Sequence, residues 1–132
     1  MKEVLDTRFF IEHFYSDNPE IQKKTREKLR GLAKEGGGVV PAVVLMEVVK
    51  ITCEKRGEDE ARIRYLSILR SGLEIANITP DIAKMAGLLR CRYHKVPMGD
   101  CIIAAVAIVS KAKVTTDDPH FEEIEAVKRA WL

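Results

Sequence analysis

Acidic residues stand at both ends of an apolar stretch in the last third of this 132-residue chain. Asp100 lies where the apolar run 101–108 begins, and Asp117 and Asp118 follow the apolar residues of 112–115. A carboxylate beside a dry core is costly unless a cation or hydrogen bonds compensate its charge. These three acids are therefore candidates for a cation site.

Two more acids occupy positions from which they could join the same site. Asp6 follows the short apolar strand expected at 4–5, and it also suits the N-cap of a helix over 9–14. Glu47 lies within the apolar stripe of the helix expected over 41–56. An acid in such a stripe is either a salt-bridge partner or a metal ligand, and this segment alone leaves both open.

Apolar periodicity and turn residues divide the chain into alternating strands and helices. Strands are expected at 4–5, 39–40, 73–78, 112–115 and 124–131, and helices over 9–14, 21–34, 41–56, 58–70, 80–93 and 100–108, with one more helix opened by Asp118 and Pro119. Strands joined through helices form right-handed crossovers and a sheet covered on both faces. We therefore expect an α/β fold: a single domain over 1–132 with a mostly parallel central sheet of four to five strands.

In an open parallel sheet, ligands bind beyond the carboxyl ends of the strands. Asp6 and the Asp117–Asp118 pair follow strands, whereas Glu47 and Asp100 lie near helix starts, which occupy the same edge. Acids gathered there would repel one another unless a divalent cation bound them. Oxygen ligands alone suit Mg²⁺ or Mn²⁺, and such a cation can activate water and orient a phosphodiester.

A basic segment stands directly before these acids. Arg90, Arg92 and Lys95 end the helix expected over 80–93 and precede Asp100. Cations favour a helix C-terminus, so interaction with the helix dipole is one interpretation, and binding of a phosphate backbone is the other. The net charge is only +2, so any nucleic-acid binding must come from a local patch such as this one.

The order and spacing of these motifs resemble the PIN domain. The resemblance is carried by Leu5-Asp6-Thr7, by Glu47 within a helix, by Asp100-x-x-x-Ala104-Ala105-x-Ala107 and by Thr116-x-Asp118-x-x-Phe121. It spans nearly the whole chain, and it is closest to the single-domain VapC-type toxins of prokaryotic toxin–antitoxin pairs.

The resemblance implies a set of site residues. The acids that bind Mg²⁺ or Mn²⁺ and carry catalysis would be Asp6, Glu47, Asp100 and Asp118, supported by the hydroxyls of Thr7 and Thr116. Aligning Thr116 and Phe121 selects Asp118 as the fourth acid, although Asp117 could compete for that role or support the site. The resemblance further implies metal-dependent endoribonuclease activity on an RNA substrate, a homodimer, and inhibition by a small antitoxin protein.

Two other functions remain open on the sequence. One is a non-catalytic PIN-like module that binds RNA or protein, and the presence of all four acids favours catalysis over it. The other is a receiver-like phosphoacceptor domain, which needs adjacent acids near the first strand. Glu3 and Asp6 do not form such a pair.

Composition bears on assembly and location. The residues of 9–14 contribute more apolar bulk than one short helix usually buries, which favours a homodimer: Phe9, Phe10, Ile11 and Phe14. Three cysteines without C-x-x-C spacing are typical of reduced thiols in a cytoplasmic protein. The chain holds no apolar run of about 18 residues, and Asp6 comes too early for a signal peptide, so we expect no membrane association.

Overall fold

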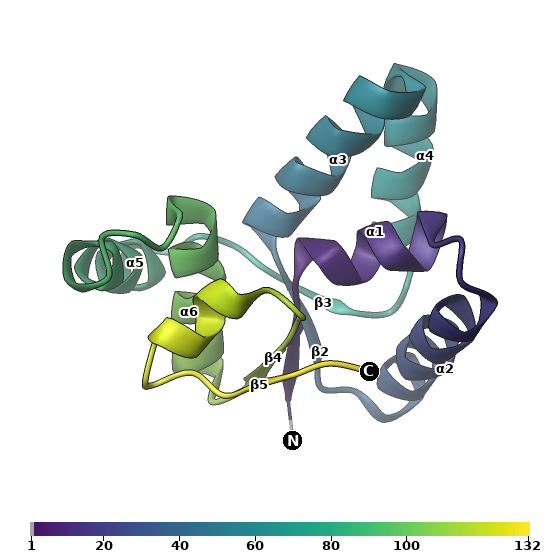
Figure 1. Ribbon diagram of the computed structural model, residues 1–132. Coiled ribbons are helices and arrows are strands. Elements are labelled where there is room, and N and C mark those ends of the chain that lie inside the picture. Colours follow the sequence, from purple (N-terminus) through teal and green to yellow (C-terminus); the bar gives the residue numbers. More distant parts are fainter. Residues whose placement is uncertain (1) are drawn as a thin grey trace.

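A five-stranded parallel sheet forms the centre of the computed structural model, which describes residues 2–132 (Figure 1). The strands are β1 (Glu3–Leu5), β2 (Gly38–Pro41), β3 (Glu74–Ala76), β4 (Lys113–Thr115) and β5 (Arg129–Ala130). The helices are α1 (Thr7–Tyr15), α2 (Pro19–Glu35), α3 (Ala42–Arg56), α4 (Glu58–Leu69), α5 (Pro80–Arg92), α6 (Met98–Ser110) and the 3₁₀ helix η1 (Pro119–Glu123). The strand order is β3-β2-β1-β4-β5, and every neighbouring pair is parallel. The expected α/β architecture is confirmed.

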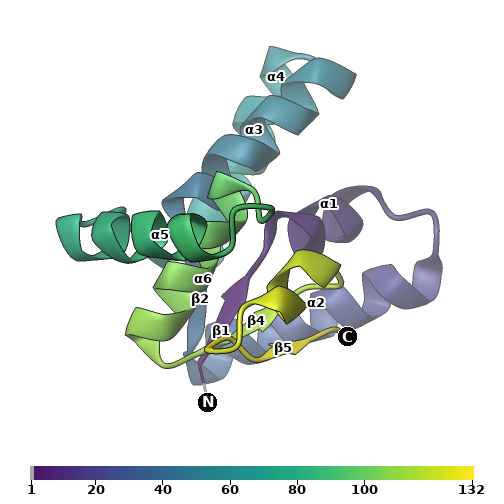
Figure 2. The same cartoon turned by 60° about the vertical axis from the view of Figure 1, so that its left-hand side comes forward.

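Helices cover both faces of the sheet. In Figure 1, α1 and α2 lie on one side of the strands and α5 and α6 on the other, and Figure 2 shows α5 packed across α6. The alanines of α6 are fully buried, which lets this helix approach β1, β2 and β4 closely. The first turn of α6 therefore lies at the carboxyl edge of the sheet.

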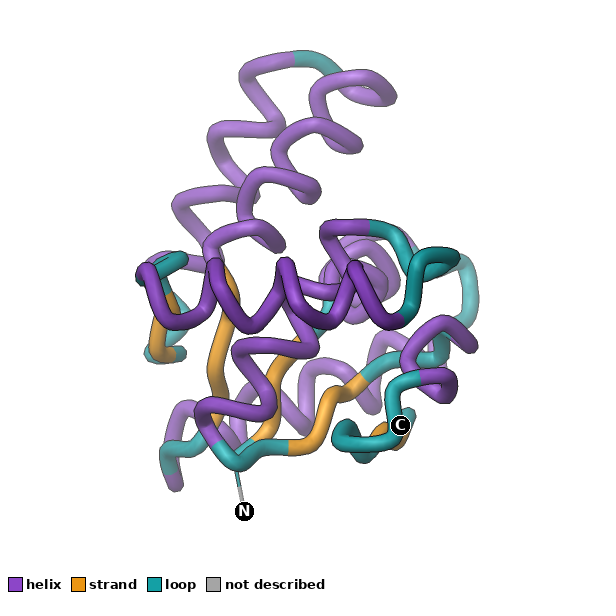
Figure 3. The backbone as a smooth tube through the Cα atoms, turned by 90° about the vertical axis from the view of Figure 1, so that its left-hand side faces the viewer, coloured by secondary structure: helices purple, strands orange, loops and turns teal. Residues whose placement is uncertain are grey.

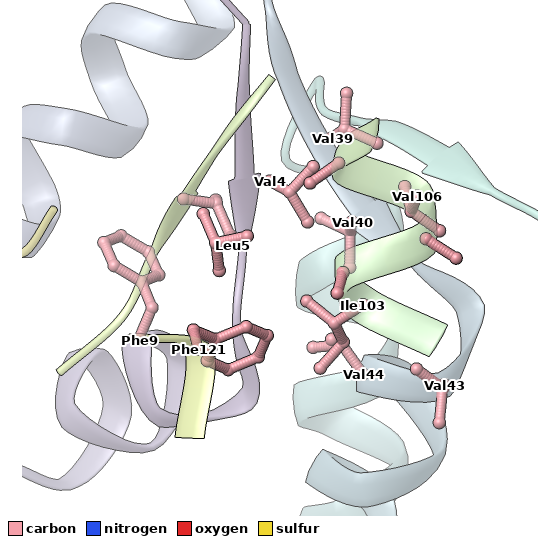
Figure 4. Close-up of a cluster of buried hydrophobic side chains, with 14 of the residues drawn as sticks. Val4, Leu5, Phe9, Val39, Val40, Val43, Val44, Ile103, Val106 and Phe121 are labelled. Atoms are coloured by element: carbon pink, nitrogen blue, oxygen red, sulfur yellow. The ribbon is translucent and has the colours of Figure 1, made fainter. Parts of the chain in front are cut away.

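The central strand β1 is buried on both of its faces. Val4 and Leu5 both have 0% exposure, and successive side chains of a strand point to opposite faces. Figure 4 shows Leu5 on the side of Phe9 and Phe121, and Val4 on the side of Ile103. Burial on both faces explains why the two strand residues before Asp6, Val4 and Leu5, are both apolar.

The α3–α4 hairpin projects from the carboxyl edge of the sheet (Figure 3). Its far end is tied back to α1 through Tyr15. The guanidinium of Arg56 lies over the Tyr15 ring at 4.3 Å from its centre, and the Tyr15 hydroxyl donates to Glu60 and accepts from Arg64. This contact fixes the direction of α3, whose first half carries Glu47 toward the sheet.

Two expectations from the sequence need correction. The predicted strand over 124–131 is only Arg129–Ala130, because Ile124 and Val127 form a turn that directs both side chains into the core. Phe9 and Phe10, at 0% and 1% exposure, pack inside the chain and provide no argument for a dimer. The homodimer itself stays a prediction that rests on the resemblance.

The sulfurs of Cys53, Cys91 and Cys101 are free thiols. Within residues 2–132, none of the helices combines the length and apolar character that crossing a bilayer requires.

Candidate metal centre

Asp6 stands at the carboxyl end of β1 and begins α1. It is 3% exposed, and its Oδ1 accepts a hydrogen bond from the backbone N–H of Thr7 at 2.7 Å. Its Oδ2 accepts a hydrogen bond from the Thr116 hydroxyl at 2.6 Å. Asp6 therefore caps the helix, as the sequence predicted, and is also held against the loop that follows β4.

The loop after β4 brings Asp118 to the same edge. The Thr116 hydroxyl, which donates to Asp6, accepts a hydrogen bond from the backbone N–H of Asp118 at 3.0 Å. Asp118 Oδ1 accepts the backbone N–H of His120 at 2.9 Å and so caps η1. One buried hydroxyl thus joins two acid-bearing segments that are 110 residues apart in the sequence.

Asp117 points to a different partner. Both of its carboxylate oxygens face the guanidinium of Arg8, in an ion pair whose second contact, from Nη2 to Oδ2, is 3.1 Å long. The two side chains are 53% and 34% exposed, so water surrounds this pair. Of the two adjacent acids, only Asp118 lies in the group formed with Asp100.

Asp100 lies in the first turn of α6, facing Asp118. His120 Nδ1 lies between the two carboxylates, 3.1 Å from Asp100 Oδ2 and 3.0 Å from Asp118 Oδ1. One possible ligand atom from each of these three residues lies within 4.8 Å of the other two. The sequence did not predict His120 as a site residue. Its position two residues after Asp118 could have indicated it. A carboxylate that caps a helix accepts the backbone N–H of the second residue after it, which brings that residue close to the carboxylate.

Glu47 reaches the site from α3. Its Oε1 is buried and has no hydrogen-bond partner within residues 2–132, and the same is true of the Thr7 hydroxyl. A Cβ at Gly99 would lie 3.3 Å from Oε1, so glycine leaves space beside this oxygen. A buried carboxylate oxygen without a partner is costly, and a cation would supply the interaction it lacks.

Burial and mutual repulsion raise the pKa of Asp100. Burial has the largest effect, the negative charges of Asp118 and Asp6 add to it, and His120 opposes it, so that the pKa rises to about 7. A carboxyl that is half protonated at neutral pH indicates a site with more negative charge than its surroundings can compensate.

The pKa values of Asp6 and Glu47 are shifted in the same direction. Burial raises the pKa of Asp6, and the hydrogen bond from Thr116 opposes the rise. Burial and the charge of Asp6 raise the pKa of Glu47. The nearby Thr7 hydroxyl opposes the rise, although its position relative to Glu47 does not meet the geometry of a hydrogen bond. This excess of carboxylate oxygens, one of them buried and unpartnered, fits a hard divalent cation such as Mg²⁺ or Mn²⁺.

The shifted carboxyls predict an unusual pH dependence of stability in the presence of a chelator. The folded protein keeps them protonated to a higher pH than the unfolded chain, where they titrate near 4, so the free energy of unfolding falls as the pH rises toward 8. His120, whose pKa is raised because its carboxylate partners outweigh burial, acts in the same direction.

Asp100→Asn tests this dependence. At pH 8 the variant is expected to be more stable than the parent by on the order of 1 kcal/mol, because it removes a repelled charge. At pH 3 the two should unfold alike, because Asp100 is then protonated in the folded protein and in the unfolded chain. Urea unfolding at both pH values measures the difference. Burial lowers the pKa of His13, which makes stability rise with pH, but this effect cancels in the comparison because both proteins keep His13. A variant less stable than the parent at pH 8 would contradict the repulsion.

The basic segment lies beside η1. Arg92 and Lys95 line a shallow hollow of about 200 Å³ that Glu123, the last residue of η1, also lines. Asp118 caps the opposite end of this five-residue helix, which at about 2.0 Å per residue is ~10 Å long. Arg90 is not among the lining residues, and its charge instead lowers the pKa of the Cys101 thiol against the larger effect of burial.

Four acids therefore converge at the edge of a parallel sheet, next to a basic hollow. The PIN-domain family model matches residues 4–127, nearly the whole chain. The chain belongs to the PIN-domain family. PIN domains are generally nucleases, and the acidic cluster of this chain could hold a metal ion.

Solved PIN-fold structures resemble this chain over almost its full length. VapBC2 from Rickettsia felis, bound to a DNA fragment from its promoter, has a TM-score of 0.80 at 21% identity, covering 99% of this chain and 98% of that one. A toxin–antitoxin complex from Klebsiella pneumoniae has a TM-score of 0.68 at 25% identity, covering 96% and 95%. VapC20 from Mycobacterium tuberculosis, a toxin that cleaves the sarcin–ricin loop, has a TM-score of 0.71 at 16% identity, covering 94% and 95%.

These structural likenesses establish the fold. A comparison of the sequence with curated proteins finds no significant match.

Proposed function

We propose that this PIN domain is a metal-dependent endoribonuclease and the toxin of a VapBC-type toxin–antitoxin pair. The observation that supports it most is the convergence of Asp6, Glu47, Asp100 and Asp118, with a buried and unpartnered oxygen on Glu47. Such a site would bind Mg²⁺ or Mn²⁺. When bound, the cation supplies an activated water and stabilises the charge that develops on a phosphodiester.

The residues of the chain have distinct parts in this proposal. The four carboxylates hold the cation, and Asp6 is kept in place by Thr7 and Thr116. Arg92 and Lys95 hold the phosphate backbone of the RNA next to the site, which offsets the repulsion between phosphate and carboxylates. Arg90, whose charge acts on the Cys101 thiol, adds positive charge near the start of α6.

Protein partners form the second half of the proposal. The Klebsiella relative was solved as a toxin–antitoxin complex, which suggests that a small antitoxin binds this chain too. Large apolar side chains are exposed on the α3–α4 hairpin, where a protein partner would cover them: Met46, Ile63, Leu66 and Leu69. We also propose a homodimer and a cytoplasmic location, both on the strength of the resemblance.

Incubation of the purified protein with a mixed RNA pool tests the function. Cutting is expected with Mg²⁺ or Mn²⁺ and not with a chelator, and the products should carry 5′-phosphate and 3′-hydroxyl ends, because an activated water does not need the ribose 2′-hydroxyl as nucleophile. Cyclic-phosphate ends, or cutting in the presence of chelator, would contradict the proposal. RNA that is bound but never cut would favour a non-catalytic binding module instead.

Arg92→Ala is expected to weaken RNA binding and to make it less dependent on salt. Loss of one phosphate contact lowers the slope of log affinity against log salt by about 0.7 for a single strand. Fluorescence anisotropy with the cutting-deficient Asp6→Asn protein as background measures the slope. Lys84→Ala is the matched control, because Lys84 is on the same helix but ~12 Å away along its axis. Equal slopes for the two variants would show that the RNA runs elsewhere.

A further inference from the structure

His120 combines a fixed backbone with a side chain directed at the acids. Its backbone N–H donates to Asp118 Oδ1 at 2.9 Å, which anchors the residue in the capped first turn of η1. Its Nδ1 lies 3.0 Å from that same Oδ1 and 3.1 Å from Asp100 Oδ2. The imidazole is thus placed between the two carboxylates.

Hydrogen bonding alone does not account well for this placement. Nδ1 carries at most one proton, so it cannot donate a well-aligned hydrogen bond to two carboxylates at once. Both oxygens are nevertheless at nearly the same distance from it. An atom equally near two carboxylate oxygens is placed as well to be a third ligand of a cation as to donate a hydrogen bond.

The separations match those between neighbouring ligands of an octahedral cation. With metal–ligand distances of roughly 2.1–2.2 Å, adjacent ligand atoms lie ~3 Å apart. The distances of 3.0 and 3.1 Å from Nδ1 to the two oxygens agree with this spacing, and the three ligand atoms lie within 4.8 Å of one another. The site therefore provides one nitrogen beside its carboxylate oxygens.

We infer that His120 is a ligand of the cation, through Nδ1, and that it makes the site prefer Mn²⁺ to Mg²⁺. This inference rests on the metal-dependent function proposed above and adds which metal that function uses. Carboxylates, carbonyls and water suit both ions, but Mn²⁺, as a first-row transition ion, binds an imidazole nitrogen more readily than Mg²⁺ does. A site of carboxylates alone would distinguish the two metals less.

Pulsed electron paramagnetic resonance of bound Mn²⁺ tests the nitrogen directly, without any cutting. The parent protein is expected to show ¹⁴N modulation from the imidazole, and His120→Gln is expected to lose it. His94→Gln is the matched control, since His94 lies on the α5–α6 connection and is not part of the acidic group; this variant should keep the modulation.

Calorimetric titration of the metal-free proteins with Mn²⁺ and with Mg²⁺ provides the second measurement. His120→Gln should weaken Mn²⁺ binding by about tenfold or more and Mg²⁺ binding by less, so that the preference shrinks. His120→Asn also removes the imidazole, and its backbone N–H can still donate to Asp118. Its circular dichroism spectrum and its titration together show whether a loss of metal affinity comes from misfolding of η1.

The outcomes separate this inference from the proposed function. Failure of the parent to bind either metal would overturn both. Binding of Mn²⁺ without ¹⁴N modulation, and with unchanged affinities in the folded His120 variants, would overturn only the role of His120. In that case the imidazole is a counter-charge for the two acids that leaves when the cation enters.

Discussion

Asp6→Asn is expected to reduce RNA cutting by at least about 100-fold while RNA binding persists. The substitution removes one charge from the centre of the proposed metal site and almost preserves the shape of the side chain. The asparagine carbonyl can still accept the backbone N–H of Thr7, and its amide can donate to the Thr116 hydroxyl, so the helix cap and the loop after β4 should stay in place.

Three measurements check the Asp6 prediction. Cutting rates with Mn²⁺ and with Mg²⁺ give the loss of activity, anisotropy gives RNA binding, and calorimetry gives the affinity for the metal. Asp81→Asn is the matched control, because Asp81 is an exposed acid in the first turn of α5 and should cut RNA like the parent. Full cutting by Asp6→Asn would exclude the acidic site as the centre of the reaction.

Phe121→Ala is expected to lower the free energy of unfolding by about 3–5 kcal/mol. Phe121 is 0% exposed and is the buried residue of η1, where it packs on the side of the sheet that holds Leu5 and Phe9 (Figure 4). Its loss leaves a cavity beneath the short helix whose first turn holds Asp118 and His120. Metal affinity should therefore fall as well, even in the fraction of protein that remains folded.

Urea unfolding in the presence of chelator measures the effect of Phe121→Ala on stability. Ile63→Ala is the control, because Ile63 is 59% exposed on α4 and its truncation should change stability by no more than about 0.5 kcal/mol. Phe121→Leu refills part of the cavity and should recover part of both losses. A loss below about 1 kcal/mol in Phe121→Ala would mean that the loop and not the aromatic ring holds η1.

The convergence of the acids was predictable because it depends on topology. Asp6 and Asp118 follow parallel strands, and the carboxyl ends of such strands meet at one edge whatever the lengths of the helices between them. The caps formed by Asp6 and Asp118 were also visible, since a cap involves only neighbouring residues. Local pattern and chain order therefore determined the fold and the position of the site.

Other features depend on where side chains point after the loops have packed. The sequence left Asp117 and Asp118 as alternatives, and the structure separates them because adjacent residues point in different directions, Asp117 to Arg8 and Asp118 to Asp100. The buried positions of Phe9 and Phe10 likewise depend on the sheet face that α1 covers, which the composition of a nine-residue helix does not specify.

His120 is the clearest case of a feature that only the tertiary structure decided. Its partner Asp100 lies 20 residues earlier, on a helix whose first turn reaches the site only because α6 packs closely on the sheet through its alanines. Asp118 then folds η1 back so that the imidazole meets that turn. The chemical type of each residue can be read along the chain, whereas the distance between two of them is set by the packing of all the elements in between.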